Sequence, residues 1–262
     1  MKNVYEIWDI LTDIIQSINK SKYSSEIVFR GAYVLRAFLN QKGYPTMRYT
    51  EDIDMDWVSN RMWKEFYDEL PDLLTRNSKL GIRYNYSARS KGFSNKKMKL
   101  ILDANFSNIT RIVSIDLSQR ITDYTLELEI NSELYKMGSL YESICDKLEV
   151  FNTHRVGGRI KDFYDLCLIS HFDGLSLYRI KQVWDSRGNV LPTPIFGISP
   201  DNFGRMRKGF DIHKEERFDN IDFEDAMQRV LNFVTVIYEI ILDEESGENI
   251  FWNRQEEEWY AK

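Results

Sequence analysis

Hydrophobic positions at the start of the chain recur first at helical spacing and then at strand spacing. An amphipathic helix is predicted by the apolar residues Ile7, Trp8, Leu11, Ile14, Ile15 and Ile18. A short apolar strand at residues 27–29 comes next, then Gly31 and a second helical pattern through Leu39. Residues 52–57 alternate acidic and apolar side chains, which predicts a strand with Asp52, Asp54 and Asp56 on one face.

The pattern changes from mixed to helical in the second half of the chain. After a helix around residues 62–70, strands are predicted at 81–87, 97–103, 111–117 and 125–130. Ser139 and Glu142 then have the spacing of a capping box, and helical patterns follow at 159–170, 176–185, from 199 on and at 222–242. We therefore expect an α/β plus α protein: a mixed β-sheet domain with flanking helices over 1–136 and a helical-bundle domain over 137–262.

Charge is unevenly distributed along an acidic chain. The 262 residues contain 35 Lys and Arg against 41 Asp and Glu, a net charge of −6, which disfavours a globally basic nucleic-acid-binding protein. A local basic stretch, however, includes Arg83, Arg89, Lys91, Lys96, Lys97 and Lys99. Such a stretch is compatible with a solvated hairpin or with a surface that holds an RNA backbone.

The remaining composition narrows the class of protein. There are only two cysteines, and the N-terminus lacks the pattern of a secretory signal, so we expect a cytoplasmic protein. The most apolar stretch, 230–242, is short and interrupted by polar residues, so no membrane association is expected. The three histidines have no metal-binding spacing and no Ser/His/Asp motif is present, which disfavours a hydrolase.

Asp52 and Asp54 are the first candidates for chemistry. Two carboxylates at i and i+2 on a strand point to the same side, roughly 7 Å apart at the backbone, so their oxygens can converge on Mg²⁺. A solvated strand face would show the same pattern, as residues 127–129 do. The glycine turn at Gly31 favours phosphate binding. With a third carboxylate at Asp116, these residues indicate a two-metal site for phosphoryl transfer from an NTP.

Three stretches resemble the motifs of the AbiEii-type nucleotidyltransferase toxins, within the DNA polymerase β-like nucleotidyltransferase superfamily. Residues 29–35 stand in the place of the family's Gly-Gly/Ser turn, with Ala32 and Tyr33 departing from it. Residues 48–54 are similar to the Arg-x-Ser/Thr-x-Asp-apolar-Asp motif. Residues 146–166 are similar to Lys-Leu-x-Ala, then Arg, then Lys/Arg-Asp-x-x-Asp. The resemblance implies a nucleotidyltransferase-like sheet domain whose active site is completed by the helical domain.

The resemblance also implies roles that spacing alone leaves open. Lys147 would bind the triphosphate, although a lysine at a helix border often extends from an apolar face into water. Asp162 and Asp165 would orient this lysine or the incoming hydroxyl, although an ordinary helix-surface pair has similar spacing. The residues implied in nucleotide binding are Arg30, Gly31, Arg48, Thr50, Lys147 and Arg155.

The function expected from these observations is Mg²⁺-dependent transfer of a nucleoside monophosphate from an NTP to an acceptor hydroxyl. Asp52, Asp54 and Asp116 would hold the metals, with Asp116 ligating or activating the hydroxyl. The resemblance implies the toxin of a toxin–antitoxin or abortive-infection system, with an antitoxin partner and tRNA or another RNA as acceptor. Two alternatives stay open: an enzyme that modifies a small molecule or protein, and a catalytically silent nucleotide-binding or RNA-binding module.

Overall fold

The computed structural model describes residues 5–44, 50–88, 97–120, 124–151, 159–187, 200–217, 221–242 and 246–262. These residues form two compact units. The first contains residues up to Lys42 and from Thr50 to Gly138, and the second contains Gly43, Tyr44 and the residues from Ser139 on. Within these ranges, no helix has the length and apolar character needed to cross a membrane.

A seven-stranded mixed sheet is the centre of the first unit, in the order β3-β4-β5-β2-β1-β7-β6. Strand β2 is parallel to β5 and antiparallel to β1, and β1 pairs in parallel with β7. The strands are β1 (Ile27–Arg30), β2 (Asp52–Trp57), β3 (Arg83–Tyr86), β4 (Lys97–Phe106), β5 (Ile109–Gln119), β6 (Thr125–Ile130) and β7 (Glu133–Gly138). The mixed α/β fold predicted from the sequence is thereby confirmed.

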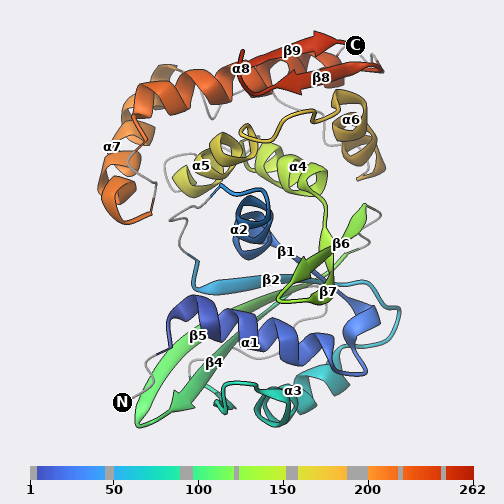
Figure 1. Ribbon diagram of the computed structural model, residues 1–262, viewed down its shortest axis with the longest axis vertical. Coiled ribbons are helices and arrows are strands. Elements are labelled where there is room, and N and C mark those ends of the chain that lie inside the picture. The colour runs from blue at the N-terminus through green and yellow to red at the C-terminus, as the bar shows by residue number, and fades with distance from the viewer. Residues whose placement is uncertain are drawn as a thin grey trace. The chain divides into compact units, whose positions relative to one another are not determined.

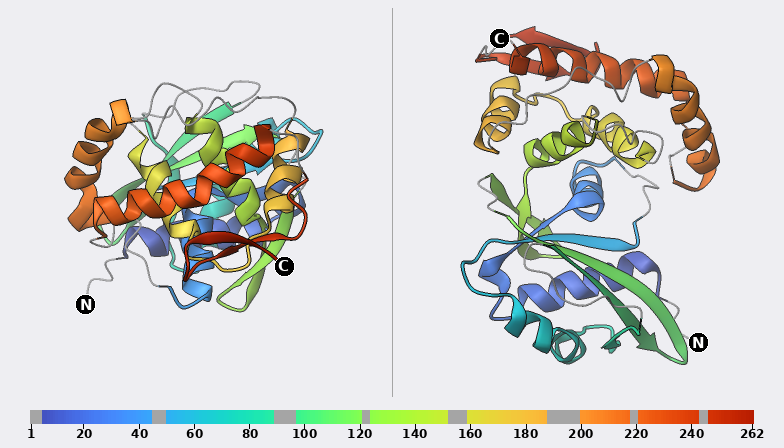
Figure 2. Two further views of the ribbon diagram at one scale, coloured as in Figure 1. Left: turned by 90° about the horizontal axis from the view of Figure 1, so that it is seen from above. Right: turned by 180° about the vertical axis from the view of Figure 1, so that it is seen from behind.

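Helices cover the two faces of this sheet differently. Helices α1 (Ile7–Asn19) and α3 (Lys64–Asn77) lie on one side of β2, and α2 (Gly31–Gln41) lies on the other (Figures 1 and 2). Ile53, Met55 and Trp57 of β2 are buried on the side of α1 and α3, where the rings of Trp57 and Phe66 are 5.6 Å apart. Alternation therefore sends the acidic residues of β2 to the opposite side, where α2 begins.

We call that opposite side the polar face, defined by the side chains that alternate with the core residues of β2 and β5. Its members are Asp52, Asp54 and Asp56 of β2 and Ser114, Asp116 and Ser118 of β5. The core residues Val113, Ile115 and Leu117 of β5 are at most 1% exposed. The sheet is thus apolar on one side and carries the candidate chemistry on the other.

Helices make up most of the second unit: α4 (Leu140–Phe151), α5 (Ile160–Ile169), α6 (Leu177–Ser186), α7 (Pro200–Arg217) and α8 (Phe223–Leu242). The Ser139 hydroxyl accepts the N–H of Glu142 at 3.3 Å, so it caps α4 as its position in the sequence predicts.

The unit also contains a hairpin that the sequence analysis did not predict, formed by β8 (Ile250–Asn253) and β9 (Glu258–Ala261). Trp252 of this hairpin is fully buried and donates its indole N–H to the Ser170 carbonyl at 2.8 Å. Trp252 therefore anchors the hairpin to the core of the unit.

Candidate active site

Strand pairing brings the three predicted metal-binding carboxylates onto adjacent strands. In the parallel pair of β2 and β5, Asp54 lies opposite Asp116 and Asp52 lies opposite Ser114. Register partners project to the same side of a sheet, so Asp54 and Asp116 are neighbours on the polar face. All three carboxylate residues are half-buried, which leaves them in contact with water. The sequence alone could not provide this juxtaposition, because it depends on the register of two strands.

Asp52 is held by a neighbour at the start of the strand. The Thr50 hydroxyl lies 2.5 Å from Oδ1 of Asp52, and Thr50 itself is only 6% exposed. A hydroxyl that donates to a carboxylate fixes its orientation and leaves the second oxygen for another partner. The structure thus gives Thr50, which was predicted to contact the nucleotide, a partner in Asp52.

Asp54 packs against Gly31, the first residue of α2. A Cβ atom on Gly31 would lie 1.9 Å from Oδ2 of Asp54 and 2.8 Å from its Cγ, and Gly31 has a φ of +76°. Only glycine satisfies both conditions, because other residues carry a Cβ and disfavour positive φ. The glycine turn therefore makes room for the candidate metal-binding carboxylate at the amino end of a helix, where negative charge is stabilised.

Arg30 and Asp56 form an ion pair that the sequence analysis did not foresee. Nε of Arg30 donates to Oδ1 of Asp56 at 2.8 Å, and the carboxylate is completely buried. Nη2 of the same guanidinium lies 3.4 Å from the Ser118 hydroxyl. These contacts link β1, β2 and β5 next to the candidate metal-binding residues. The available signal was the continued alternation of β2, which placed Asp56 on the face of Asp52 and Asp54.

Asp116 is paired with a lysine from the neighbouring strand. Lys99 of β4 is its register partner, and Nζ of Lys99 lies 3.1 Å from Oδ2 of Asp116. Lys97, two residues earlier, lies opposite Ser118 and so projects to the same face. The basic stretch of the sequence therefore reaches the polar face itself.

The donor atoms on the polar face suit Mg²⁺, which prefers carboxylate oxygens. In the described part of the chain, however, no group of three or more carboxylate, imidazole or thiol side chains is placed to hold a metal ion. Mg²⁺ is commonly held by one or two carboxylates together with water and substrate phosphates. Asp52 and Asp54 with Asp116 fit this mode of binding, in which the triphosphate supplies the remaining ligands.

Lys147 of α4 joins two acids of α5 in the second unit. Its Nζ lies 2.7 Å from Oδ1 of Asp162 and 2.8 Å from Oδ2 of Asp165, and Arg159 also contacts Asp162 at 3.1 Å. Burial acts to lower the pKa of Lys147, but the charges of Asp165 and Asp162 outweigh it and hold this pKa above its ordinary value. The lysine is therefore charged, and it ends on two carboxylates within the protein.

Some predicted residues lie outside the described residues, namely Arg48, Arg155, Arg89, Lys91 and Lys96. Of the remaining basic stretch, Arg83 is exposed and lies opposite Asn105 on the edge of the sheet, on the same side as Lys97 and Lys99.

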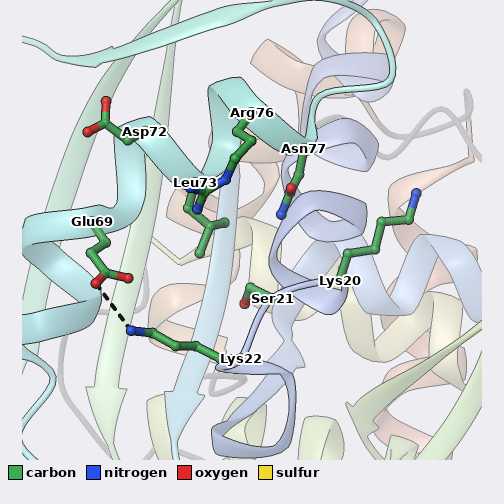
Figure 3. A pocket seen from close by; sticks show the side chains of 8 residues that line it. All are labelled: Lys20, Ser21, Lys22, Glu69, Asp72, Leu73, Arg76 and Asn77. Atoms are coloured by element: carbon green, nitrogen blue, oxygen red, sulfur yellow. Dashed lines mark hydrogen bonds and ion pairs between the residues drawn. The ribbon is translucent and has the colours of Figure 1, made fainter.

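A surface pocket lies between the end of α1 and α3, on the side of the sheet away from the polar face (Figure 3). Its lining residues are Lys20, Ser21, Lys22, Glu69, Asp72, Leu73, Arg76 and Asn77. Lys22 already pairs with Glu65 at 2.6 Å and with Glu69 at 3.1 Å. This pocket contains none of the predicted site residues, so the polar face remains the candidate active site.

Comparison with known proteins identifies a family and similar folds. A family model described as "Nucleotidyl transferase AbiEii toxin, Type IV TA system" matches residues 13–235. A crystal structure of a candidate nucleotidyltransferase from H. pylori superimposes with a TM-score of 0.53 at 14% identity, covering 91% of this chain and 96% of that one. JHP933 from Helicobacter pylori gives a TM-score of 0.53 at 12% identity, with 90% and 91% covered. No curated protein matches the chain at a significant level.

Proposed function

Because this chain belongs to the AbiEii nucleotidyltransferase toxin family, we propose that it transfers a nucleoside monophosphate from Mg²⁺·NTP to an acceptor hydroxyl. In this reaction the acceptor oxygen bonds to the α-phosphorus, the bond from that phosphorus to the β-phosphate oxygen breaks, and pyrophosphate leaves. The observation that carries the proposal is the register of Asp54 with Asp116, next to the glycine on which Asp54 packs.

Each residue of the polar face has a distinct task in this proposal. Asp52, oriented by Thr50, and Asp54, packed on Gly31, would hold Mg²⁺. When bound, the metal supplies positive charge that stabilises the phosphates as negative charge shifts to the leaving group. Asp116 would ligate metal or accept the proton of the acceptor hydroxyl. The N–H groups at the start of α2 would bind phosphate oxygens.

The proposal is tested by incubating the purified protein with each labelled NTP, Mg²⁺ and total RNA. Asp54→Asn should abolish labelling while leaving the urea midpoint close to that of the wild type, because a half-buried carboxylate at the sheet surface adds little to the core. Asp103→Asn on β4 is the matched control, since it removes an acid from the same sheet outside the site. Full labelling by Asp54→Asn would refute the assignment, and labelling of only a protein or small molecule would change the acceptor class.

We further propose that Lys147 contacts the triphosphate, as the family motif implies. Lys147→Met should destabilise the protein, because it leaves the fully buried carboxylate of Asp165 without its ammonium partner. The variant Lys147→Met/Asp162→Asn/Asp165→Asn removes all three charges together and should recover much of that stability. NTP binding, measured by equilibrium dialysis, should stay weak in both variants. If the triple variant binds NTP like the wild type, Lys147 has a structural role only.

RNA is the proposed acceptor, with tRNA as the first candidate, and a cognate antitoxin is the proposed protein partner. Lys97 is an exposed cation beside the candidate site, and Arg83 is an exposed cation on the same side of the sheet, farther along β4. Phosphate contacts release counterions, so RNA labelling should fall steeply with salt while NTP binding falls less. Arg83→Glu/Lys97→Glu should reduce RNA labelling without changing NTP binding. Lys99 is left intact in this variant, because it contacts Asp116, a proposed metal-binding residue.

A further inference from the structure

Lys99 faces one of the proposed metal-binding carboxylates directly. It lies opposite Asp116 in the antiparallel pair of β4 and β5, and Nζ is 3.1 Å from Oδ2. The Lys99 side chain is 55% exposed and that of Asp116 is 35% exposed. This contrasts with Asp52, whose carboxylate receives a neutral hydroxyl from Thr50. The structure therefore gives Asp116 a cationic partner at the position where the proposed function requires a metal.

We propose that Lys99 is a positioning residue that holds Asp116 in the absence of metal and competes with the divalent cation for this carboxylate. The inference rests on the proposed function, because it assumes that Asp116 belongs to the metal site. Lys99 would keep the carboxylate turned toward β4 until Mg²⁺·NTP displaces it.

The physical basis is that both partners can exchange easily. An exposed ion pair is worth at most about 1 kcal/mol, because water and salt compensate each charge when the pair opens. The lysine ammonium ends a flexible four-carbon chain and can turn to solvent or to a phosphate oxygen. A divalent ion attracts the carboxylate more strongly than a single positive charge does at the same distance. The metal can therefore displace Lys99. Because the Lys99–Asp116 ion pair must break first, the apparent metal affinity is lower than it would be without Lys99.

The test is a titration with Mn²⁺ alone, followed by loss of the free-ion electron paramagnetic resonance signal. Lys99→Met should bind Mn²⁺ about threefold to tenfold more tightly than the wild type, since both the competing ion pair and a nearby repulsive charge are removed. Lys97→Met is the matched control, because it removes the same charge from the same face of β4, opposite Ser118. It should change the affinity by less than about twofold.

A second variant separates competition from a general charge effect. In an Asp116→Asn background, Lys99→Met should no longer increase the Mn²⁺ affinity, because the carboxylate for which lysine and metal compete is gone. If the wild type binds Mn²⁺ and Lys99→Met increases the Mn²⁺ affinity no more than Lys97→Met does, the inference is wrong and the proposed metal site still stands. If neither the wild type nor Lys99→Met binds Mn²⁺, the inference is wrong, because no free cation competes with Lys99 for Asp116, and the labelling test of Asp54→Asn then decides whether the metal site stands. Binding by Lys99→Met alone supports both.

Discussion

Gly31→Ala tests the central geometric claim about the site, namely that Asp54 occupies the space where any other residue would carry a Cβ. The substitution has two separable consequences. A φ of +76° is unfavourable for alanine by roughly 1–2 kcal/mol. The new Cβ would also lie 1.9 Å from Oδ2, 2.8 Å from Cγ and 3.0 Å from Cβ of Asp54. Because three atoms are too close, rotation of the carboxylate alone cannot relieve the contact.

Gly81 provides a matched control within the same unit. Its φ is +68° and no atom lies within 4 Å of the Cβ that alanine would add. Gly81→Ala should therefore lose only the backbone contribution of roughly 1–2 kcal/mol. Gly31→Ala adds an overpacking cost of about 1–3 kcal/mol, so its total loss should be about 2–5 kcal/mol. Urea unfolding of both variants measures the difference directly.

Activity should respond more strongly than stability. Relief of the contact moves the Asp54 carboxylate by more than about 1 Å, and displacement on this scale costs on the order of 100-fold in rate. NTP labelling by Gly31→Ala should therefore fall about 100-fold at urea concentrations where the variant is fully folded, while Gly81→Ala keeps its rate. In an Asp54→Ala background, the extra destabilisation by Ala at position 31 should shrink. Equal stability and equal activity of the two glycine variants would refute the proposed packing.

Buried charges in the two units give two more expected outcomes. Asp56→Ala should lower the free energy of unfolding by about 3 kcal/mol, because Arg30 loses its carboxylate, whereas Arg30→Met/Asp56→Leu should lose much less. A loss under about 1 kcal/mol in urea would contradict a structural role for this pair. Burial, with the charge of Arg229, lowers the pKa of His171 to about 4. Because the unfolded state, with a pKa of about 6.5, takes up the proton first, the free energy of unfolding should be highest above pH 6.5. It should fall by on the order of 2 kcal/mol as the pH is lowered toward about 4. An unchanged pH dependence of unfolding in His171→Gln would assign the effect to another group.

The sequence predicted the elements that depend on local signals. The glycine between strand and helix, the acidic strand and the Ser139 cap were all readable, because each depends on neighbouring residues. Strand β7 was missed, although Tyr135 and Met137 alternate as buried residues within it. The turn before it has positive φ at both Asn131 and Ser132, as a two-residue hairpin requires. Asn-Ser is a weaker signal for such a turn than Asn-Gly.

The missed C-terminal hairpin shows a limit of a different kind. Strands β8 and β9 contain only four residues each. The hairpin is held by contacts to residues distant in the sequence. The ring of Trp259 stacks on Phe233 with centroids 5.5 Å apart, and the Trp252 indole N–H donates a hydrogen bond to the Ser170 carbonyl. No local pattern encodes contacts of this range. A residue's part in such a core becomes visible only when the fold is known.

The three acids of β2 show which part of a site a motif can predict. Asp52, Asp54 and Asp56 share one alternating pattern, yet the strand runs from half-buried positions at Asp52 and Asp54 to complete burial at Asp56. A carboxylate that holds hydrated Mg²⁺ must keep contact with water, whereas a fully buried one needs a cation from the protein. Arg30 meets that need for Asp56, and its position follows from the antiparallel pairing of β1 with β2. Spacing therefore predicts which side of the sheet carries acids, and burial decides which of them remain available to a metal.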